Sequence, residues 1–395
     1  MNNRLSKKVI NSVDSLTLSL AEKAKNYKDA GESVIRFGTG EPDFTTPEYI
    51  CAGAKTAIDA GYTKYDAVAG VFALREAIAE KLKKDNQLDY EPDEIIVSSG
   101  AKSSLSIALQ TILNPGDEVI IPKPYWVSYT EMVKLSEGIP VIIETTYENK
   151  FKMTADELRR AITPKTKAVM LNTPVNPTGV VYLKRELEAL AEVIVEKNIF
   201  VISDEIYDEF VYDGVEALSI ASLGEAVKKN TILVNGFSKT YAMTGWRLGY
   251  AAASKDIIDG MKRIQGHMIS HPSTISQHAG ITALEGKDKT IPGMIAVFDK
   301  RRKAMMARLD KLPQLSYIYP QSTFYIFVDM RKIIEDNRYD IISGFDFSEK
   351  LLIEQKVVTI PGEAFGVDHY VRFSFAASLE AIEEGFNRIE QFLKI

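Results

Sequence analysis

The chain has 395 residues, more than one simple hydrophobic core usually supports, and this length predicts two domains. Its net charge of −6 at neutral pH gives no electrostatic reason to expect nucleic acid or an anionic membrane as a partner. The single cysteine, Cys51, excludes an intrachain disulfide and a cysteine-rich metal site, and it fits a reducing compartment.

The amino-terminal twenty residues place basic side chains before a partly apolar stretch. Asn11 and Asp14 interrupt this stretch, and no small-residue cleavage pattern follows it. No apolar run in the chain approaches the length of a membrane span. We therefore expect a cytoplasmic protein without a signal peptide or a membrane partner.

Short apolar strands alternate with amphipathic helix patterns, which predicts an α/β fold with a largely parallel sheet. The predicted strands are residues 94–98, 118–121, 168–171, 199–203, 231–235 and 247–252. The predicted helices are residues 102–113, 184–197 and 255–266. Polar or glycine-containing segments follow nearly every strand. Ligands of open α/β sheets bind at the carboxyl ends of strands, so these segments predict one composite site.

A long helical pattern rich in Arg, Lys and Met covers residues 291–312 and is typical of a connector. Beyond it, strands expected near residues 324–329 and 370–375 predict a smaller α+β unit. We expect a large domain of residues 46–290 and a small domain of residues 1–45 and 291–395.

The segment GFSKTYAMTGWR, residues 236–247, follows an apolar strand and contains Ser238, Lys239 and Arg247. A hydroxyl and a guanidinium can hold one phosphate while the lysine amine reaches a neighbouring carbonyl. This combination suits an aldehyde cofactor such as pyridoxal phosphate. A surface lysine after a strand is the alternative, and the Ser-Lys pair alone does not exclude it.

Three further segments can contribute to a cofactor site. Residues 98–102 join a strand to a helix start, where backbone N–H groups can bind phosphate, although such a segment is often only a turn. The Trp126 indole can stack on a flat ring or pack in a core. Asn176 precedes Pro177, which favours an extended backbone and can present the amide into a cleft.

Asp204 and Tyr207 lie at the end of a predicted strand. Asp204 either caps a helix or meets a pyridine nitrogen, whose pKa it would raise so that the ring stays protonated. A protonated ring is an electron sink for a carbanion. Tyr207 and Asn176 can donate hydrogen bonds to the phenolic oxygen of such a ring from two sides.

Arg372 is a charged residue in the apolar strand pattern VRFSF. Its planar guanidinium suits a carboxylate held by two hydrogen bonds, and a structural ion pair is the alternative. Gly40 can let a substrate approach the backbone closely. His267, His271 and His278 lie within twelve residues, but the acidic and cysteine companions of a strong metal site are absent, which favours helix and interface packing.

With these segments in order, the chain resembles the fold-type I pyridoxal-phosphate aminotransferases of class I/II, and among them the bacterial aspartate aminotransferase group often called I-beta. The resemblance runs nearly end to end, through GEPDFTTP, SSGAKSS, PYWVSY, NTPVNPTG, DEIYD, GFSKTYAMTGWRLGY, PGEAFG and VRFSFA. It implies a large domain with a mostly parallel seven-stranded sheet between helices, a smaller α+β domain, and a homodimer with shared active sites.

The resemblance also implies a role for each matching residue. Lys239 would carry pyridoxal 5'-phosphate covalently, Asp204 would meet the pyridine nitrogen, and Trp126 would stack on the ring. Tyr207 and Asn176 would bind its phenolic oxygen. The residues implied around the phosphate are Gly100, Ala101, Lys102, Ser238, Arg247 and, across the dimer interface, Tyr65.

On the substrate side, the resemblance implies that Arg372 and Gly40 bind the α-carboxylate, next to Trp126 and Asn176. Ser15, Thr17 and Lys102 fit the family's pattern for a second, distal carboxylate. Val13 stands where members that also accept prephenate carry a lysine, which argues against that activity.

Two departures from the family's pattern leave the substrate open. Gln321-Ser322-Thr323 replaces the usual Glu-Gly-Ala, and Val175 stands where Asn is common. The implied activity is amino transfer between an L-amino acid, aspartate or glutamate first, and 2-oxoglutarate or oxaloacetate. Broader, aromatic or alanine specificity and a β-lyase or decarboxylase on the same fold are alternatives. A regulator without turnover is another, although its relatives carry a DNA-binding domain for which this chain has neither the room nor the basic charge.

Overall fold

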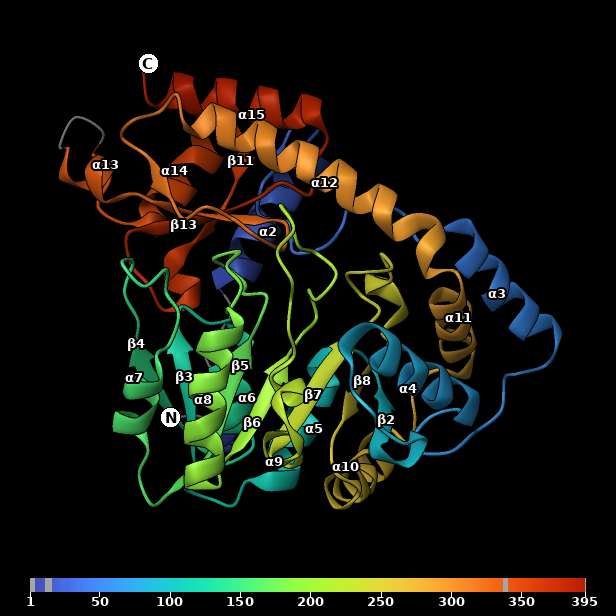
Figure 1. Ribbon diagram of the computed structural model, residues 1–395. Helices are drawn as coiled ribbons and strands as arrows, with labels where there is room; N and C mark the ends of the chain where they lie inside the picture. Colours follow the sequence, from blue (N-terminus) through green and yellow to red (C-terminus); the bar gives the residue numbers. More distant parts are fainter. Residues whose placement is uncertain (1–3, 11–15, 337–339, 395) are drawn as a thin grey trace.

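The computed structural model describes residues 4–10, 16–336 and 340–394. A seven-stranded sheet forms its larger layer (Figure 1). In spatial order its strands are β2 (Ile95–Ser98), β8 (Gly249–Ala252), β7 (Thr231–Gly236), β6 (Phe200–Asp204), β5 (Thr166–Asn172), β3 (Glu118–Lys123) and β4 (Ile139–Glu144). Strand β8 is antiparallel to both neighbours, and the other neighbouring pairs are parallel. The expected mostly parallel sheet is confirmed.

Helices cover both faces of this sheet, which explains why its central strands are nearly continuous apolar runs. Ile202 and Val234 pack toward one face, against α5 (Ala101–Ile112), α6 (Ser128–Leu135) and α10 (Lys255–Met268). Val201 and Leu233 point to the other face. That face is covered by α7 (Ala155–Ala161), α8 (Lys184–Lys197), α9 (Glu225–Lys229), α3 (Glu48–Asp59), α4 (Phe72–Asn86) and α11 (Thr274–Glu285).

Two differences from the expected elements have local causes. The sequence pattern did not predict strand β4. This strand lies at the sheet edge, begins Ile-Pro and is partly exposed along its length, so it lacks the continuous apolar pattern of the central strands. The strand expected from Arg247 begins at Gly249, because Arg247 has a left-handed backbone with φ 53° that cannot join the ladder.

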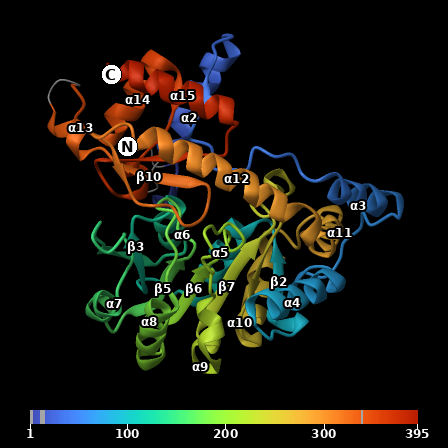
Figure 2. The same ribbon diagram turned by 45° about the horizontal axis from the view of Figure 1, so that its top comes forward.

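A second, antiparallel sheet lies beyond the carboxyl ends of the large sheet's parallel strands. Its spatial order is β12 (Ile360–Pro361), β13 (Tyr370–Ser374), β10 (Tyr325–Asp329) and β9 (Ser316–Tyr317). Helices α13 (Arg331–Glu335), α14 (Gly344–Gln355) and α15 (Leu379–Phe392) belong to this layer (Figure 2). The expected domain boundaries stay a prediction.

An amino-terminal and a carboxy-terminal segment of the chain meet in this second layer. Strand β1 (Ile35–Arg36) pairs in parallel with β11 (Val357–Val358), and α2 (Leu16–Asp29) packs beside it, whereas α1 (Lys7–Ile10) lies nearer α6. Helix α12 (Lys287–Leu309) runs from α11 to the second layer (Figure 1), beginning four residues before the expected connector. Among the helices of the described residues, none is long and apolar enough to cross a membrane.

Candidate active site

A cavity of about 780 Å³ opens between the two sheets. Its walls come from the segments after the strands of the large sheet, from β13 and from the amino-terminal segment before α3. The expected site residues that line it are Gly40, Ala101, Lys102, Trp126, Asn176, Asp204, Tyr207, Ser238, Lys239, Arg247 and Arg372. The structure thus brings together residues that are separated by more than three hundred positions in the chain, such as Gly38 and Arg372.

Lys239 follows β7 and points into this cavity, where its Nζ donates a hydrogen bond to the carbonyl oxygen of Gly40 at 2.5 Å. Desolvation lowers the pKa of Lys239 to about 8; the carboxylate of Glu41 opposes this effect, and the charges of Arg372 and Arg247 add to it. A lysine with a pKa near 8 is partly neutral at physiological pH. The neutral amine can act as a nucleophile and as a base.

Asp204 is the last residue of β6 and is buried. Its Oδ2 accepts a hydrogen bond from Tyr129 Oη at 2.6 Å, and its Oδ1 accepts one from the backbone N–H of Ile206 at 3.3 Å. Burial raises the pKa of Asp204 to about 6, against these two hydrogen bonds and the charge of Lys239, which lower it. No helix begins within residues 205–219, which form turns at residues 206–209 and 213–214, a single bridge at Val211 and irregular backbone, so Asp204 does not cap a helix.

Tyr129 is a site residue that the sequence reasoning missed. It stands in the PYWVSY segment three residues after Trp126, in the first turn of α6, and its ring meets Trp126 edge-on at 5.5 Å. The position of Tyr129 three residues after the expected stacking residue Trp126 is a signal from which its place in the site could have been predicted. Its partner Asp204 lies 75 positions away, and only the fold brings the two together.

Arg372 lies on β13 with its side chain 6% exposed. Its Nη1 donates to Asn176 Oδ1 at 2.9 Å, and its Nη2 donates to the carbonyl oxygen of Gly38 at 3.2 Å. Within the described residues its buried Nε has no hydrogen-bond partner and no carboxylate pairs with its guanidinium, so this part of the chain shows no structural ion pair for Arg372. A buried guanidinium without an acidic partner suits an incoming carboxylate.

Tyr207 and Tyr325 form a hydrogen-bonded pair of phenols beside Arg372. Their hydroxyl oxygens lie 3.0 Å apart, and the Arg372 guanidinium lies 4.1 Å from the centre of the Tyr325 ring. Tyr325, on β10, is a second residue that the sequence reasoning missed. Because Asn176 Oδ1 accepts from Arg372, the Asn176 amide nitrogen remains to donate into the cavity. The single O–H of Tyr207 can donate there when Tyr325 is the donor within the pair.

The opposite end of the cavity has the features of a phosphate site. Gly100 precedes the first turn of α5 with φ 87°, and a Cβ built there would lie 2.6 Å from Arg247 Nη2. Only glycine leaves this space between the helix start and the guanidinium. Ala101, Ser238 and Arg247 line the same end, and the positive end of the α5 dipole points toward it.

Trp126 and Lys102 lie next to each other in the lining of the cavity. Trp126 is partly exposed and lines the cavity, and it also packs against the hydrophobic core next to α5 and α6. Lys102 Nζ lies 4.7 Å from the centre of a Trp126 ring. Desolvation and the nearby charge of Arg247 lower the pKa of Lys102.

Some expected residues are not placed in the cavity. Tyr65 is 92% exposed and meets only the edge of His271 among the aromatic rings. Val13, Ser15 and the side chain of Thr17 lie outside the described residues. The residues at the two departures from the family's pattern, Val175 and 321–323, are not among those that line the cavity.

Two of the three histidines, His271 and His278, pack within the fold, whereas the expected interface packing stays a prediction. His271 Nε2 accepts a hydrogen bond from the backbone N–H of Asp66 at 3.1 Å, and His278 stacks on Tyr62 with ring centres 4.0 Å apart. In the described part of the chain, no group of three His, Cys, Asp or Glu residues is placed to hold a metal ion.

Comparisons with known proteins agree with this geometry. The family model described as "Aminotransferase class I and II" matches residues 32–389. The aspartate aminotransferase of Bacillus sp. (strain YM-2) is 46% identical over 394 residues, with 100% of both chains covered. The probable aspartate/prephenate aminotransferase of Aquifex aeolicus is 40% identical, again with 100% of both chains covered.

A solved structure shows the same architecture. The aspartate aminotransferase from Thermus thermophilus with maleate superposes with a TM-score of 0.93 and 38% identity, over 98% of this chain and 99% of that one. The cavity offers what pyridoxal phosphate requires: a phosphate cradle, a buried carboxylate and a lysine of lowered pKa. The chain therefore belongs to the class I and II aminotransferases, has their fold-type I architecture, and is a transaminase that depends on pyridoxal 5'-phosphate.

Proposed function

We propose that this enzyme transfers the amino group of aspartate or glutamate to a 2-oxo acid, with oxaloacetate and 2-oxoglutarate as the corresponding oxo acids. The observation that carries the proposal is that Arg372, which pairs with no carboxylate among the described residues, and Lys102 line one cavity with Lys239. Arg372 would bind the α-carboxylate that every amino acid has, and Lys102 the second carboxylate. The Bacillus relative is named an aspartate aminotransferase, and the Thermus structure holds maleate, a dicarboxylate.

The charge of the cavity supports a substrate with two negative charges. The chain as a whole has a net charge of −6, yet basic side chains outnumber acidic ones around the cavity. The basic residues are Lys25, Lys28, Arg36, Lys102, Lys239, Arg247 and Arg372, and the acidic ones are Asp29, Glu41 and Asp204. Such a field raises the local concentration of dicarboxylates.

The roles of the cofactor-site residues follow from their places. Bound pyridoxal 5'-phosphate supplies an electron-withdrawing ring that stabilises negative charge on the substrate's α-carbon. Gly100, Ala101, Ser238 and Arg247 would hold the phosphate, and Trp126 would cover the ring. Tyr207 and the Asn176 amide would donate to the phenolic oxygen.

Two groups would control protons. Above its pKa of about 6, the Asp204 carboxylate would hold a proton on the ring nitrogen. Lys239, to which the cofactor would attach, would as a free neutral amine accept the proton from the substrate's α-carbon. Arg372 and the backbone near Gly40 would orient the substrate so that this proton faces Lys239.

A half-reaction panel tests the substrate. The cofactor-loaded enzyme is mixed with single amino acids, and the change in cofactor absorbance is followed by stopped flow. We expect aspartate and glutamate to react fastest. Faster reaction with phenylalanine, tyrosine, alanine or methionine would overturn the proposed specificity, and release of ammonia, pyruvate or carbon dioxide would indicate a lyase or decarboxylase.

We further propose a homodimer with shared active sites, in which Tyr65 reaches the phosphate of a second copy. Tyr65 is 92% exposed and is not among the residues that line the cavity of its own chain, which supports this arrangement. Sedimentation tests the dimer. Mixed subunits carrying Tyr65→Ala and Lys239→Ala should regain part of the activity, whereas a fully active monomer would contradict the proposal.

We also infer a cytoplasmic location. The single cysteine supports it, as does the bacterial origin of the relatives described above. Fractionation of cells that express the chain at its natural level tests this inference, and recovery in an extracellular fraction would contradict it.

A further inference from the structure

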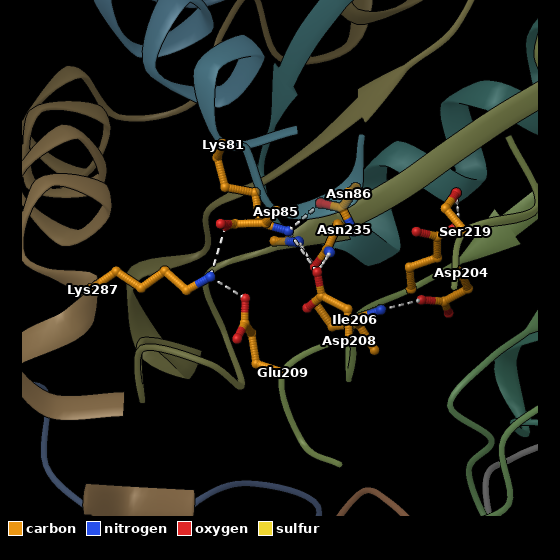
Figure 3. A network of polar contacts seen from close by, with 12 residues as sticks. Lys81, Asp85, Asn86, Asp204, Ile206, Asp208, Glu209, Ser219, Asn235 and Lys287 are labelled. Atoms are coloured by element: carbon orange, nitrogen blue, oxygen red, sulfur yellow. Dashed lines mark hydrogen bonds and ion pairs between the residues drawn. The ribbon is translucent and has the colours of Figure 1, made fainter. Parts of the chain in front are cut away.

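A buried polar network joins α4 to the segment after β6 and to the end of β7 (Figure 3). Lys81 Nζ, from α4, forms an ion pair with Asp208 Oδ2 at 2.6 Å, and each side chain is only 9% exposed. Asn235 Nδ2, from β7, donates to the same oxygen at 2.9 Å. Lys81 also donates to Asn86 Oδ1 at 2.8 Å. Its ammonium has three donors, and these bonds use two of them.

The Asp208 carboxylate joins the two segments that carry the proposed chemistry. Asp208 directly follows Tyr207 and lies four residues after Asp204. Asn235 lies four residues before Lys239, and its Oδ1 accepts a hydrogen bond from the backbone N–H of Gly236 at 2.7 Å. One carboxylate oxygen therefore ties the exit of β6 to the exit of β7.

The ion pair is charged in the folded protein. Burial alone would disfavour the ammonium, but the adjacent Asp208 carboxylate raises the pKa of Lys81 well above its ordinary value. Toward the outside, Lys287 closes the network through ion pairs with Asp85 and Glu209 (Figure 3). Breaking a buried pair of this kind leaves an uncompensated charge, so the pair resists displacement.

A small chamber beside the pair contains hydroxyls that lack partners. It has a volume of about 10 Å³, and Lys81, Asp208, Asn235, Thr240 and Tyr241 are among the residues that line it. Thr240 Oγ1 and Tyr241 Oη are buried and have no hydrogen-bond partner within the described residues. This volume is about the smallest that holds one water molecule, and several polar groups surround it.

We propose that Lys81 and Asp208 are positioning residues of the cofactor site, and that one water in this chamber completes the link by bridging Lys81 to the hydroxyls of Thr240 and Tyr241. The ion pair then holds the turn after β6 on one side and, through Asn235 and the water, the turn after β7 on the other. The consequence is a fixed separation between Asp204 and Lys239. The inference rests on the roles proposed above for those two residues.

The test compares Lys81→Met with Lys83→Met on the same helix. Lys83 pairs with Asp89 at 3.0 Å, but these side chains are 71% and 76% exposed, so its loss should change little. Lys81→Met should lower kcat by roughly tenfold to a hundredfold, the range expected for misplaced reacting groups, with little change in KM. Lys83→Met should match the wild type.

A second measurement does not depend on the cofactor or on turnover. In the cofactor-free protein, Lys81→Met should speed amide hydrogen exchange by roughly tenfold in residues 204–209 and 236–242, while the seven-stranded sheet elsewhere exchanges as in the wild type. If this local effect appears but no amino acid reacts, the proposed function fails and the positioning role stands. If exchange rises evenly through the chain, or kcat is unchanged, the pair is only structural and the inference is overturned.

Thr240→Val keeps the inference testable if Lys81→Met does not fold. This nearly isosteric change leaves the ion pair intact and removes one hydroxyl from the chamber. We expect a lower kcat and faster exchange confined to residues 236–242. Exchange and kcat equal to those of the wild type would overturn the bridge, as would a high-resolution crystal structure with an empty chamber and both hydroxyls bonded elsewhere.

Discussion

The two ends of the active-site cavity are built in different ways. The end at which we propose that the cofactor binds, called the cofactor end below, uses segments that follow strands of one sheet, such as Gly100 after β2, Asp204 at the end of β6 and Ser238 after β7. The end around Arg372, where we propose that the substrate's α-carboxylate binds, is called the substrate end. The substrate end joins Arg372 from the second sheet to the backbone of Gly38 in the amino-terminal segment. The topology of a single sheet therefore suffices to assemble the cofactor end, whereas the substrate end requires two layers to meet.

The electrostatics of the two ends differ as well. At the cofactor end the buried acid Asp204 has a hydrogen-bond donor in Tyr129, so its charge is supported before any ligand binds. At the substrate end the buried base Arg372 contacts neutral oxygens and has no carboxylate partner among the described residues. The hydrogen bond from Tyr129 keeps the Asp204 carboxylate in one position and one charge state. The Arg372 guanidinium, in contrast, can bind the carboxylate of one substrate and then that of another.

Lys239→Ala, at the cofactor end, should cause the largest loss of activity. Loss of the amine removes the acid–base group, and we expect kcat to fall by about 10⁴-fold, the upper end for such a group. The phosphate cradle should still retain the cofactor without a covalent bond. Borohydride reduction of the wild type should place the cofactor on the peptide that contains Ser238-Lys239-Thr240, and its recovery on another lysine would refute the assignment.

Arg372→Leu, at the substrate end, should lower kcat/KM for every amino acid. Leaving one partner of a buried charge pair without its counterpart costs roughly 3–5 kcal/mol, which is about two to four decades in kcat/KM. The measurement is kcat/KM for aspartate and for alanine in the same variant. A loss confined to aspartate would mean that Arg372 binds the distal carboxylate.

Lys102→Ala should affect substrates with a second carboxylate more than substrates without one. We expect kcat/KM for aspartate to fall roughly tenfold, since a solvent-accessible charged hydrogen bond contributes less than a buried one, and values for phenylalanine and alanine to change little. The pKa of Lys102 is lowered, so its ammonium is lost as pH rises through that pKa. The preference for aspartate should therefore decline at alkaline pH, and equal losses for all three amino acids would contradict a distal-carboxylate role.

Tyr129→Phe should produce the smallest effect and sharpen the account of the cofactor end. The hydrogen bond from Tyr129 lowers the pKa of Asp204, which burial raises to about 6. Without this hydrogen bond the pKa of Asp204 rises further. On acidification the Asp204 carboxylate therefore becomes protonated at a higher pH than in the wild type. Activity at pH 6 should fall roughly fivefold, with little change at pH 8. Carbon-13 NMR of the Asp204 carboxyl in the cofactor-free protein checks the direction, and an unchanged titration would contradict it.

Much of this protein was determined by local sequence. The alternation of apolar runs with amphipathic helices predicted the parallel sheet, because strands buried on both faces must be apolar throughout. The polar segments after those strands predicted the part of the cavity lining that lies at the edge of the large sheet, such as Trp126, Asp204 and Lys239, because parallel strands present their carboxyl ends at one edge. Strand β4 escaped prediction because an exposed edge strand lacks that continuous pattern.

Contacts between distant segments were decided only by the tertiary structure. Tyr129 meets Asp204 across 75 positions, Lys81 meets Asp208 across 127, and Arg372 meets Asn176 across 196. A residue's type and its sequence neighbours show that its side chain can donate a hydrogen bond or carry a charge. They do not show which distant side chain will be its partner. That choice depends on how helices and the second sheet pack on the first, where burial makes each unpaired polar group costly and so selects the pairs that form.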